Sequence, residues 1–279
     1  MKIIRSKSEL RELTRGWRVS GESIGVVPTM GALHDGHLSL VSAACARCDR
    51  VIVTLFVNPK QFNNPEDLEK YPRTEDSDAV KLAPYDVDVL YVPDGAQMYP
   101  DGFATTISVD GVSDGLCGAT RPGHFDGVAT VVAKLLRQSD ADFAFFGEKD
   151  YQQVQVVRRV SEDLDLNCEI VPCPTVREDS GLALSSRNLR LDDAARQRAS
   201  IIHATLSETA RAIASGQEAG SALDKARGSL LAHGLGPIDY LEMRRERDLA
   251  VVQDNTAPAR LFVAVWLDGV RLIDNLAIG

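Results

Sequence analysis

The sequence lacks the long hydrophobic segments that mark membrane and secreted proteins. No apolar stretch reaches the roughly 18 residues that a membrane-spanning helix requires. Residues 1–7, Met-Lys-Ile-Ile-Arg-Ser-Lys, contain no apolar block of the kind found in secretory signal peptides. We therefore expect a soluble cytoplasmic protein with no membrane partner.

Positive charge is also in short supply. The 31 Lys and Arg residues are outnumbered by 40 Asp and Glu residues, which gives a formal net charge of −9. A general nucleic-acid or membrane-surface binder needs a basic face. We therefore expect no nucleic-acid partner, although a local basic groove stays possible.

Cysteine is sparse, with 5 residues in a chain of 279, and this length can bury a large core without disulfides. Cys45 and Cys48 have the spacing of a redox or zinc pair. They also continue a helical apolar face, together with Leu40, Val41 and Ala44. Without a second close pair, we favour a structural role over a metal or redox role.

Two common catalytic motifs are missing. The sequence contains no G-x-x-x-x-G-K-[ST] loop, which argues against P-loop phosphate chemistry. It contains no G-x-S-x-G motif either, so a hydrolase nucleophile elbow is not indicated.

Apolar blocks alternate with amphipathic segments through the first part of the chain. We expect strands at Ile24–Val27, Val51–Val57, Val87–Val92, Thr105–Val109, Asp142–Phe146 and Cys168–Val171. Helices are expected after His37 and at Phe125–Arg137 and Tyr151–Asp163. This alternation predicts an α/β fold with a doubly wound parallel sheet of Rossmann-like type, in a domain spanning residues 1–176. Such sheets bind ligands at the carboxyl ends of their strands.

The pattern changes after Val176. Helical stretches are expected at Asp192–Ser215 and Glu218–Leu231, followed by strands at Ile238–Arg244, Leu261–Leu267 and Val270–Asp274. The last two strands are joined through Asp268-Gly269, a sequence typical of a β-hairpin. We therefore expect a smaller C-terminal α+β domain spanning residues 177–279, which could close over a site as a lid.

The most informative segment is Pro28-Thr29-Met30-Gly31-Ala32-Leu33-His34-Asp35-Gly36-His37. It lies between an apolar run and an amphipathic run, which predicts a glycine turn that leads from a strand into a helix. Backbone N–H groups at a helix start attract phosphate, and two imidazoles add donors there. Gly36 would let a flat ring approach the backbone. We favour phosphate binding over a structural role, and over zinc, because His-x-x-His supplies only two ligands.

Four further segments follow expected strand ends or the domain junction: Val57–Asn63, Gly118–Gly127, Phe145–Gln153 and Leu184–Asn188. The first offers the neutral amide Gln61, and the second offers Arg121, which could clamp a carboxylate or phosphate or could be solvated. Lys149 near a helix start is unfavourable unless an anion binds there. The last segment could contact polyphosphate or could simply cap a helix.

Taken together, these segments resemble the pantoate–β-alanine ligase (pantothenate synthetase) family of H-x-G-H nucleotidyltransferases. The H-x-G-H positions correspond to residues 34–37. The resemblance covers nearly the whole chain, through Pro28–His37, Val57–Phe62, Tyr71-Pro72-Arg73, Gly118–Gly127, Phe146–Gln153 and Ser185–Asn188.

The resemblance implies a reaction in two steps. ATP and (R)-pantoate give pantoyl adenylate and pyrophosphate, and β-alanine then attacks the adenylate to give pantothenate and AMP. The family also implies Mg²⁺ as a cofactor and a homodimer as the assembly.

The same resemblance implies a set of site residues. The implied catalytic residues are His37, His34 and Lys149. The implied ATP-binding residues are Met30, Gly31, His34, Gly36, His37, Gly147, Glu148, Lys149, Asp150, Val176, Leu184, Ser185, Ser186 and Arg187. The implied substrate-binding residues are Gln61, Gln153, Arg121, His124 and Tyr71, and the implied metal ligand is Asp78. Leu184 replaces a methionine usual in the family, and its similar volume should preserve function.

Two other functions remain to be compared with the ligase. A plain nucleotidyltransferase would join a nucleotide to a phosphate ester and would need extra basic residues, whereas Gln61 and Gln153 are neutral. A nucleotide-sensing module without catalysis would not need His34, His37 and Lys149, yet all three are present.

Overall fold

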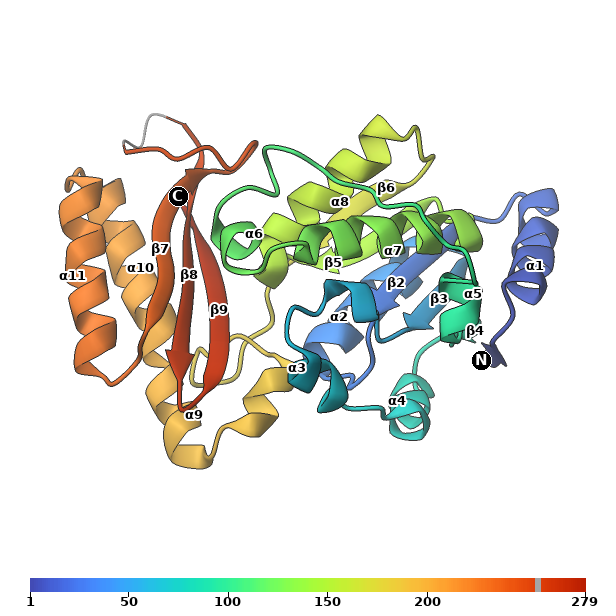
Figure 1. Ribbon diagram of the computed structural model, residues 1–279, viewed down its shortest axis with the longest axis horizontal. Coiled ribbons are helices and arrows are strands. Elements are labelled where there is room, and N and C mark those ends of the chain that lie inside the picture. Colours follow the sequence, from blue (N-terminus) through green and yellow to red (C-terminus); the bar gives the residue numbers. More distant parts are fainter. Residues whose placement is uncertain (254–256) are drawn as a thin grey trace.

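The structure is a computed structural model that describes residues 1–253 and 257–279. It contains one six-stranded sheet and one three-stranded sheet, each covered by helices (Figure 1). No helix among the described residues is long and apolar enough to cross a membrane.

The larger sheet is parallel throughout and follows the order β1-β4-β3-β2-β5-β6. Its strands are β1 (Lys2–Ile4), β2 (Ile24–Thr29), β3 (Arg50–Leu55), β4 (Val89–Tyr91), β5 (Phe143–Gly147) and β6 (Glu169–Cys173). The chain adds β3 and β4 on one side of β2, and β5 and β6 on the other. The direction of winding therefore reverses between β2 and β5, which is where such sheets place their ligands.

Helices cover both faces of this sheet. On one face, α1 (Lys7–Val19), α7 (His124–Ser139) and α8 (Tyr151–Asp163) share an apolar core with the strands. On the other face, α2 (Asp35–Arg47) and α4 (Glu75–Leu82) bury Leu40, Val41 and Leu82. Burial of one apolar stripe per helix explains this arrangement. The predicted doubly wound parallel fold is confirmed.

Short helical segments connect these elements. They are η1 (Pro59–Gln61), α3 (Pro65–Glu69), α5 (Gly95–Met98), α6 (Leu116–Thr120), η2 (Glu148–Asp150) and η3 (Ser186–Arg190). Three of them, η1, η2 and η3, carry residues predicted for the site. All three begin shortly beyond a strand end or in the segment between the two sheets.

The smaller sheet is antiparallel in the order β7-β8-β9. Its strands are β7 (Ile238–Arg245), β8 (Ala259–Leu267) and β9 (Val270–Ile278), and the helices of this region are α9 (Asp193–Ala199), α10 (Ile201–Ala214) and α11 (Ala219–Ala232). The predicted hairpin is confirmed, because Asp268 and Gly269 join β8 to β9 with φ of 48° and 75°.

The three-stranded sheet lies between its own helices and the rest of the molecule (Figure 1). Met243, Leu261 and Val263 on one face share a core with α10 and α11. Tyr240 and Phe262 on the other face belong to the core of the parallel sheet. The second sheet is therefore packed directly against the first region through an apolar surface.

Three secondary-structure expectations need correction. No strand forms at Thr105–Val109, because the Ile107 N–H donates to the Thr130 hydroxyl on α7 instead of to a neighbouring strand. The helical stretch predicted at Asp192–Ser215 is divided into α9 and α10 at Ser200. The elements β1 and α1 were not predicted. The three residues of β1 give too little alternation to detect, whereas α1 has an apolar face at helical spacing (Leu10, Leu13 and Trp17) that was overlooked.

The five cysteines are free thiols. Cys45 and Cys48 are partly buried and pack against the core on the α2 side of the sheet. Burial raises the pKa of the Cys48 thiol to about 11, so this thiol stays protonated and unreactive at neutral pH. The geometry agrees with the structural role that we favoured for this pair.

Candidate active site

A cavity of about 220 Å³ opens at the carboxyl ends of β2 and β5. Most of the predicted site residues line it, although they come from widely separated segments of the chain. They are Met30, His34, Gly36, His37, Gln61, Tyr71, Arg121, His124, Gly147, Lys149, Asp150, Gln153, Leu184, Ser185, Ser186 and Arg187. The remainder of the wall is largely apolar and comes from α7, β5, β2, α2 and the segment after β3.

The two predicted histidines begin helix α2. His34 is the N-cap residue, and its Nδ1 accepts a hydrogen bond from the Gly36 N–H at 3.2 Å. The His34 N–H is directed to Nδ1 of His37 at 3.4 Å, so each ring satisfies one backbone donor. The ring centroids lie 4.1 Å apart. Since Nδ1 accepts in both rings, the proton of each neutral imidazole resides on Nε2.

Gly36 has a structural reason to be glycine in addition to the expected one. A Cβ atom at this position would lie 2.9 Å from Cε1 of His34. The ring of His34 therefore occupies the space that a side chain at position 36 would need, and Gly36 itself lines the cavity. Glycine is required here because the cap residue folds back over its own helix start.

Burial keeps both imidazoles neutral. It lowers the pKa of His34 to about 4, with a further contribution from the nearby Lys149 ammonium. It lowers the pKa of His37 to about 3, and the neighbouring His34 adds to the effect. At neutral pH both rings can donate hydrogen bonds from Nε2 without carrying charge.

Three positively charged side chains reach the same cavity from distant segments: Arg121, Lys149 and Arg187. Lys149 lies on η2 directly after β5, and its Nζ is 3.7 Å from a carboxylate oxygen of Asp150. Arg187 lies on η3 and pairs with Asp67 at 3.2 Å. These cations occur in a chain with a net charge of −9, so the cavity is a local basic site in an acidic protein.

Asp150 is the one carboxylate among the described residues that line this cavity. Partial removal from bulk water would by itself raise its pKa, although 47% of the side chain is accessible. The charges of Lys149 and Arg187 outweigh burial, and the pKa lies below its ordinary value. Asp150 is therefore ionised and partly balances the surrounding cations.

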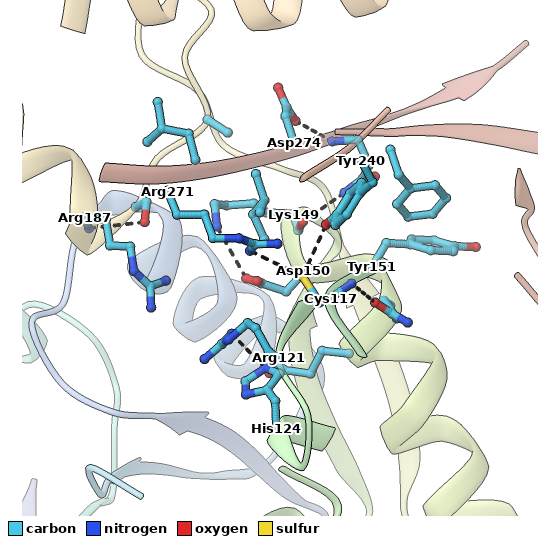
Figure 2. A pocket seen from close by; sticks show the side chains of 18 of the residues that line it. Cys117, Arg121, His124, Lys149, Asp150, Tyr151, Arg187, Tyr240, Arg271 and Asp274 are labelled. Atoms are coloured by element: carbon cyan, nitrogen blue, oxygen red, sulfur yellow. Dashed lines mark hydrogen bonds and ion pairs between the residues drawn. The ribbon is translucent and has the colours of Figure 1, made fainter. Parts of the chain in front are cut away.

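Arg121 and His124 lie side by side and form a hydrogen bond (Figure 2). Both also bind the backbone carbonyl of Gln61. His124 Nδ1 donates to the Gln61 carbonyl at 2.8 Å, and Arg121 Nη1 donates to His124 Nε2 at 3.0 Å. Burial, together with the Arg121 charge, lowers the pKa of His124 to about 3. Burial and the charge of Arg187 lower the pKa of Arg121, which forms no ion pair with any carboxylate that the structure describes. This guanidinium is therefore well placed to bind an anionic ligand.

The predicted amide Gln61 is held in place by a residue that the sequence did not single out as a site residue. The buried Asn58 donates to Gln61 Oε1 at 3.0 Å and to the Gly127 carbonyl at 3.0 Å. Gln61 Nε2 lies 3.0 Å from the Met30 sulfur. A Cβ on Gly127 would lie 2.3 Å from the Lys60 carbonyl, so α7 contacts the η1 backbone directly.

Four predicted residues do not line the cavity: Gly31, Asp78, Glu148 and Val176. Gly31 forms the turn after β2 with a φ of 86°. The Val176 carbonyl accepts a hydrogen bond from the Leu184 N–H at 3.0 Å. The Glu148 carbonyl accepts one from Asn275 at 2.9 Å. These three residues support the site through the backbone.

The geometry corrects the prediction that Asp78 is a metal ligand. Asp78 is fully buried, and its two oxygens accept hydrogen bonds from the N–H groups of Ala32 and Leu33, each at 2.9 Å. The Thr74 hydroxyl adds a third donor at 2.9 Å. Ala32 has a φ of 52°, so this carboxylate holds a strained turn just before His34. Among the described residues, no group of three or more His, Cys, Asp or Glu side chains could hold a metal ion.

Comparisons with known proteins show the family to which the chain belongs. The Pantoate-beta-alanine ligase family profile matches residues 2–277. Pantothenate synthetase of Ruegeria pomeroyi is 60% identical over 99% of this chain and 97% of its own length. Pantothenate synthetase of Paracoccus denitrificans is 61% identical over 99% of this chain and 98% of its own.

Solved structures give the same result. Pantothenate synthetase from Thermus thermophilus superimposes with a TM-score of 0.93 at 41% identity, covering 100% of this chain and 99% of that one. Pantoate-beta-alanine ligase from Francisella tularensis, solved with Beta-gamma ATP and Beta-alanine, gives a TM-score of 0.85 at 37% identity, covering 100% and 98%. The fold, the cavity at the switch point and these full-length similarities lead to one conclusion: the chain belongs to the pantoate-beta-alanine ligase family and is a ligase of that type.

Proposed function

We propose that this protein condenses (R)-pantoate with β-alanine at the expense of ATP, through a pantoyl-adenylate intermediate, and releases AMP and pyrophosphate. The observation that carries the proposal is the convergence of Lys149, Arg187 and two neutral imidazoles on one cavity. The Francisella tularensis relative, which binds Beta-gamma ATP and Beta-alanine, supports the assignment of the ligands.

In the first step, a pantoate carboxylate oxygen attacks the α-phosphorus of ATP, and the bond from that phosphorus to the bridging oxygen breaks. Negative charge increases on the phosphate oxygens and on the leaving pyrophosphate. Lys149 and Arg187 stabilise this charge, and His34 and His37 donate hydrogen bonds from Nε2. Neutral donors suit this role because they do not have to change protonation state during the reaction.

Substrate pantoate is held by uncharged groups. We assign its hydroxyl and carboxylate oxygens to the side-chain amides of Gln61 and Gln153, both of which line the cavity. An amide can bind an attacking carboxylate without neutralising it, so the nucleophile keeps its charge. Tyr71 lines the same wall.

In the second step, the amine of β-alanine attacks the acyl carbon, the bond to the adenylate oxygen breaks, AMP leaves and the amine proton passes to a base. The guanidinium of Arg121, which is linked to His124 and pairs with no carboxylate among the described residues, is our candidate for binding the β-alanine carboxylate. Residues 177–279, proposed as a separate lid domain, would exclude water from the reactive adenylate.

Mg²⁺ bound with ATP would neutralise part of the triphosphate charge. Asp150, ionised and facing the cavity, is the residue that fits contact with such an ion. One carboxylate together with phosphate oxygens is a common way for proteins to bind Mg²⁺.

We also propose that the protein is a homodimer and that it is located in the cytoplasm. Size-exclusion chromatography with light scattering can test the homodimer.

Exchange of labelled pyrophosphate into ATP tests the reaction. The exchange should require pantoate and should proceed without β-alanine, because the adenylate forms in the first step. Exchange without pantoate would contradict the proposal. A stable nucleotide conjugate found by mass spectrometry in place of free AMP would favour a plain nucleotidyltransferase.

A further inference from the structure

The turn that carries Lys149 is held from the second sheet. Asn275, on β9, is 3% exposed. Its Nδ2 donates to the Glu148 carbonyl at 2.9 Å and to the Lys149 carbonyl at 2.9 Å. One amide group therefore binds two successive carbonyls of η2, more than 120 residues away along the chain.

The orientation of this amide is fixed by Arg260 on β8. Arg260 Nη1 donates to Asn275 Oδ1 at 2.6 Å. The guanidinium stacks over the Tyr151 ring, 4.0 Å from its centroid, and Nε pairs with Glu246 at 3.2 Å. If the Asn275 amide were rotated by 180°, its oxygen would face the carbonyl oxygens of Glu148 and Lys149. The hydrogen-bond network therefore allows only one orientation of this amide.

The η2 turn has little local support of its own. It has only three residues, and such short 3₁₀ segments have weak internal hydrogen bonds. Gly147, before η2, has no side chain that could cap the turn, and the Asp150 side chain, before α8, accepts no capping hydrogen bond in the described structure. Lys149 also lies at a helix start, where the helix dipole opposes a cation. The position of the ammonium therefore depends on the contact from β9.

We propose that Asn275 is a positioning residue for the adenylation step: by binding the Glu148 and Lys149 carbonyls, it holds the Lys149 ammonium in the place where the phosphates of ATP react. This inference rests on the proposed function. Asn275 itself does not line the main cavity, although it contributes to the wall of a smaller adjoining cavity, the one drawn in Figure 2, which is also lined by Lys149.

The test is Asn275→Asp, measured by pantoate-dependent pyrophosphate exchange. The aspartate has the same shape and can still accept from Arg260, but it has no donor for the two carbonyls. We expect kcat to fall about 10- to 100-fold, the range for a misplaced catalytic group. The KM for pantoate should change less than kcat, because Gln61 lies on η1 and Gln153 lies on α8, which is held by its own core contacts. A kcat equal to that of the wild type would overturn the inference.

A double-mutant cycle separates positioning from general damage. In a Lys149→Met background the same Asn275→Asp change should alter kcat by less than about twofold, because the group that it positions is gone. Equal loss in both backgrounds would mean that Asn275 acts on the fold as a whole, and would overturn the inference.

Two further variants keep the result interpretable. Asn167→Asp adds the same charge at an exposed bend and should leave exchange unchanged. If Asn275→Asp does not fold, Arg260→Gln decides, since it frees the Asn275 amide to rotate. Because this variant also removes the pairs with Glu246 and Glu148 and the contact with Tyr151, only the part of its effect that depends on Lys149 counts. A kcat loss that disappears in the Lys149→Met background supports the inference, and any other result overturns it. If the wild type shows no pantoate-dependent exchange, the proposed function itself fails, which is a separate outcome.

Discussion

The two sheets contribute to the site in different ways. The parallel sheet delivers side chains to the cavity from the ends of its strands: His34 and His37 follow β2, and Lys149 follows β5. The antiparallel sheet places side chains behind the cavity, where Asn275 binds the backbone of η2. In our proposal, the turns after the parallel strands supply most of the reacting groups, and the antiparallel sheet holds one of those turns in place.

This difference follows from sheet architecture. Parallel strands all end at one edge, so the turns that follow them meet there and can form a cavity. Antiparallel strands joined by tight turns present flat faces, which suit packing. Here one face packs on α10 and α11 and the other on the parallel region. Variants in the two regions should therefore affect different measurements.

The largest expected effect is on the catalytic side. Lys149→Met should lower pyrophosphate exchange about 10²- to 10³-fold, as removal of one charge-stabilising donor does in other enzymes. The melting temperature should stay close to that of the wild type, because Lys149 is not part of the core. Lys225→Met, on an exposed ion pair of α11, is the matched control and should leave exchange unchanged. Full activity of Lys149→Met would contradict the assignment of phosphate binding to the turns of the parallel region.

The corresponding change in the second region should affect stability. Asp274 on β9 is 4% exposed and binds Arg177, just after the end of the parallel region, through two hydrogen bonds of 2.6 and 2.9 Å. Asp274→Ala leaves a largely buried guanidinium unpaired and should lower the free energy of unfolding by about 3 kcal/mol. Urea denaturation measures this.

A matched variant at an exposed ion pair serves as the control for Asp274→Ala. Glu208→Ala breaks the exposed pair with Lys225 and should change the unfolding free energy by less than about 1 kcal/mol. Equal losses from the two variants would show that the buried Arg177–Asp274 pair contributes no more to stability than a surface pair.

Asp78→Asn tests whether the first region also contains purely structural groups. The change weakens the hydrogen bonds to the Ala32 and Leu33 N–H groups and should lower the free energy of unfolding by about 2 kcal/mol. The Mg²⁺ concentration that gives half-maximal exchange should be unchanged. An increased Mg²⁺ requirement with unchanged stability would restore Asp78 as a metal ligand.

The pH dependence of stability should reflect His124. The pKa of His124 is lowered from its ordinary value of 6.5 to about 3 in the folded protein. Between pH 3 and pH 6.5, the unfolded chain therefore binds a proton at this residue that the folded chain does not bind. Stability must then fall as pH falls from 6.5, by about 2 kcal/mol at pH 5 from this group. His124→Gln should remove that part of the loss. His233→Gln, at an exposed histidine, should not.

The measurement for His124 is urea denaturation at pH 7 and pH 5. The Arg121 guanidinium faces the ring, Arg187 and Asp150 lie near it, and His34 and His37 add acid sensitivity of their own. The difference between wild type and His124→Gln isolates the contribution of this residue. If the unfolding free energy of His124→Gln fell between pH 7 and pH 5 by as much as that of the wild type, this would contradict the neutral tautomer that we assign.

Much of the parallel region was predictable from sequence, because its signals are local. The helix predicted at Tyr151–Asp163 has these bounds in the structure, and the predicted strands at β2, β3 and β5 are present. The motif around His34 and His37 identified the central turn. Thr105–Val109 was predicted wrongly, because its apolar alternation reflects packing against α7 without a partner strand.

The support of the site was not predictable in this way. The role of Asp78 depends on two backbone N–H groups more than 40 residues away, and that of Asn275 on two carbonyls more than 120 residues away. Nothing in the residues next to Asn275 indicates a catalytic loop. Such roles follow from which surfaces of the two regions meet, and this is a property of the folded chain.

The most direct test of the account is a crystal structure of the protein with ATP and pantoate. We predict that the triphosphate lies in the cavity between β2 and β5, with phosphate oxygens about 2.7–3.2 Å from Lys149 Nζ and from Nε2 of His34 or His37. A triphosphate bound elsewhere, with these groups facing solvent or one another, would contradict the central claim.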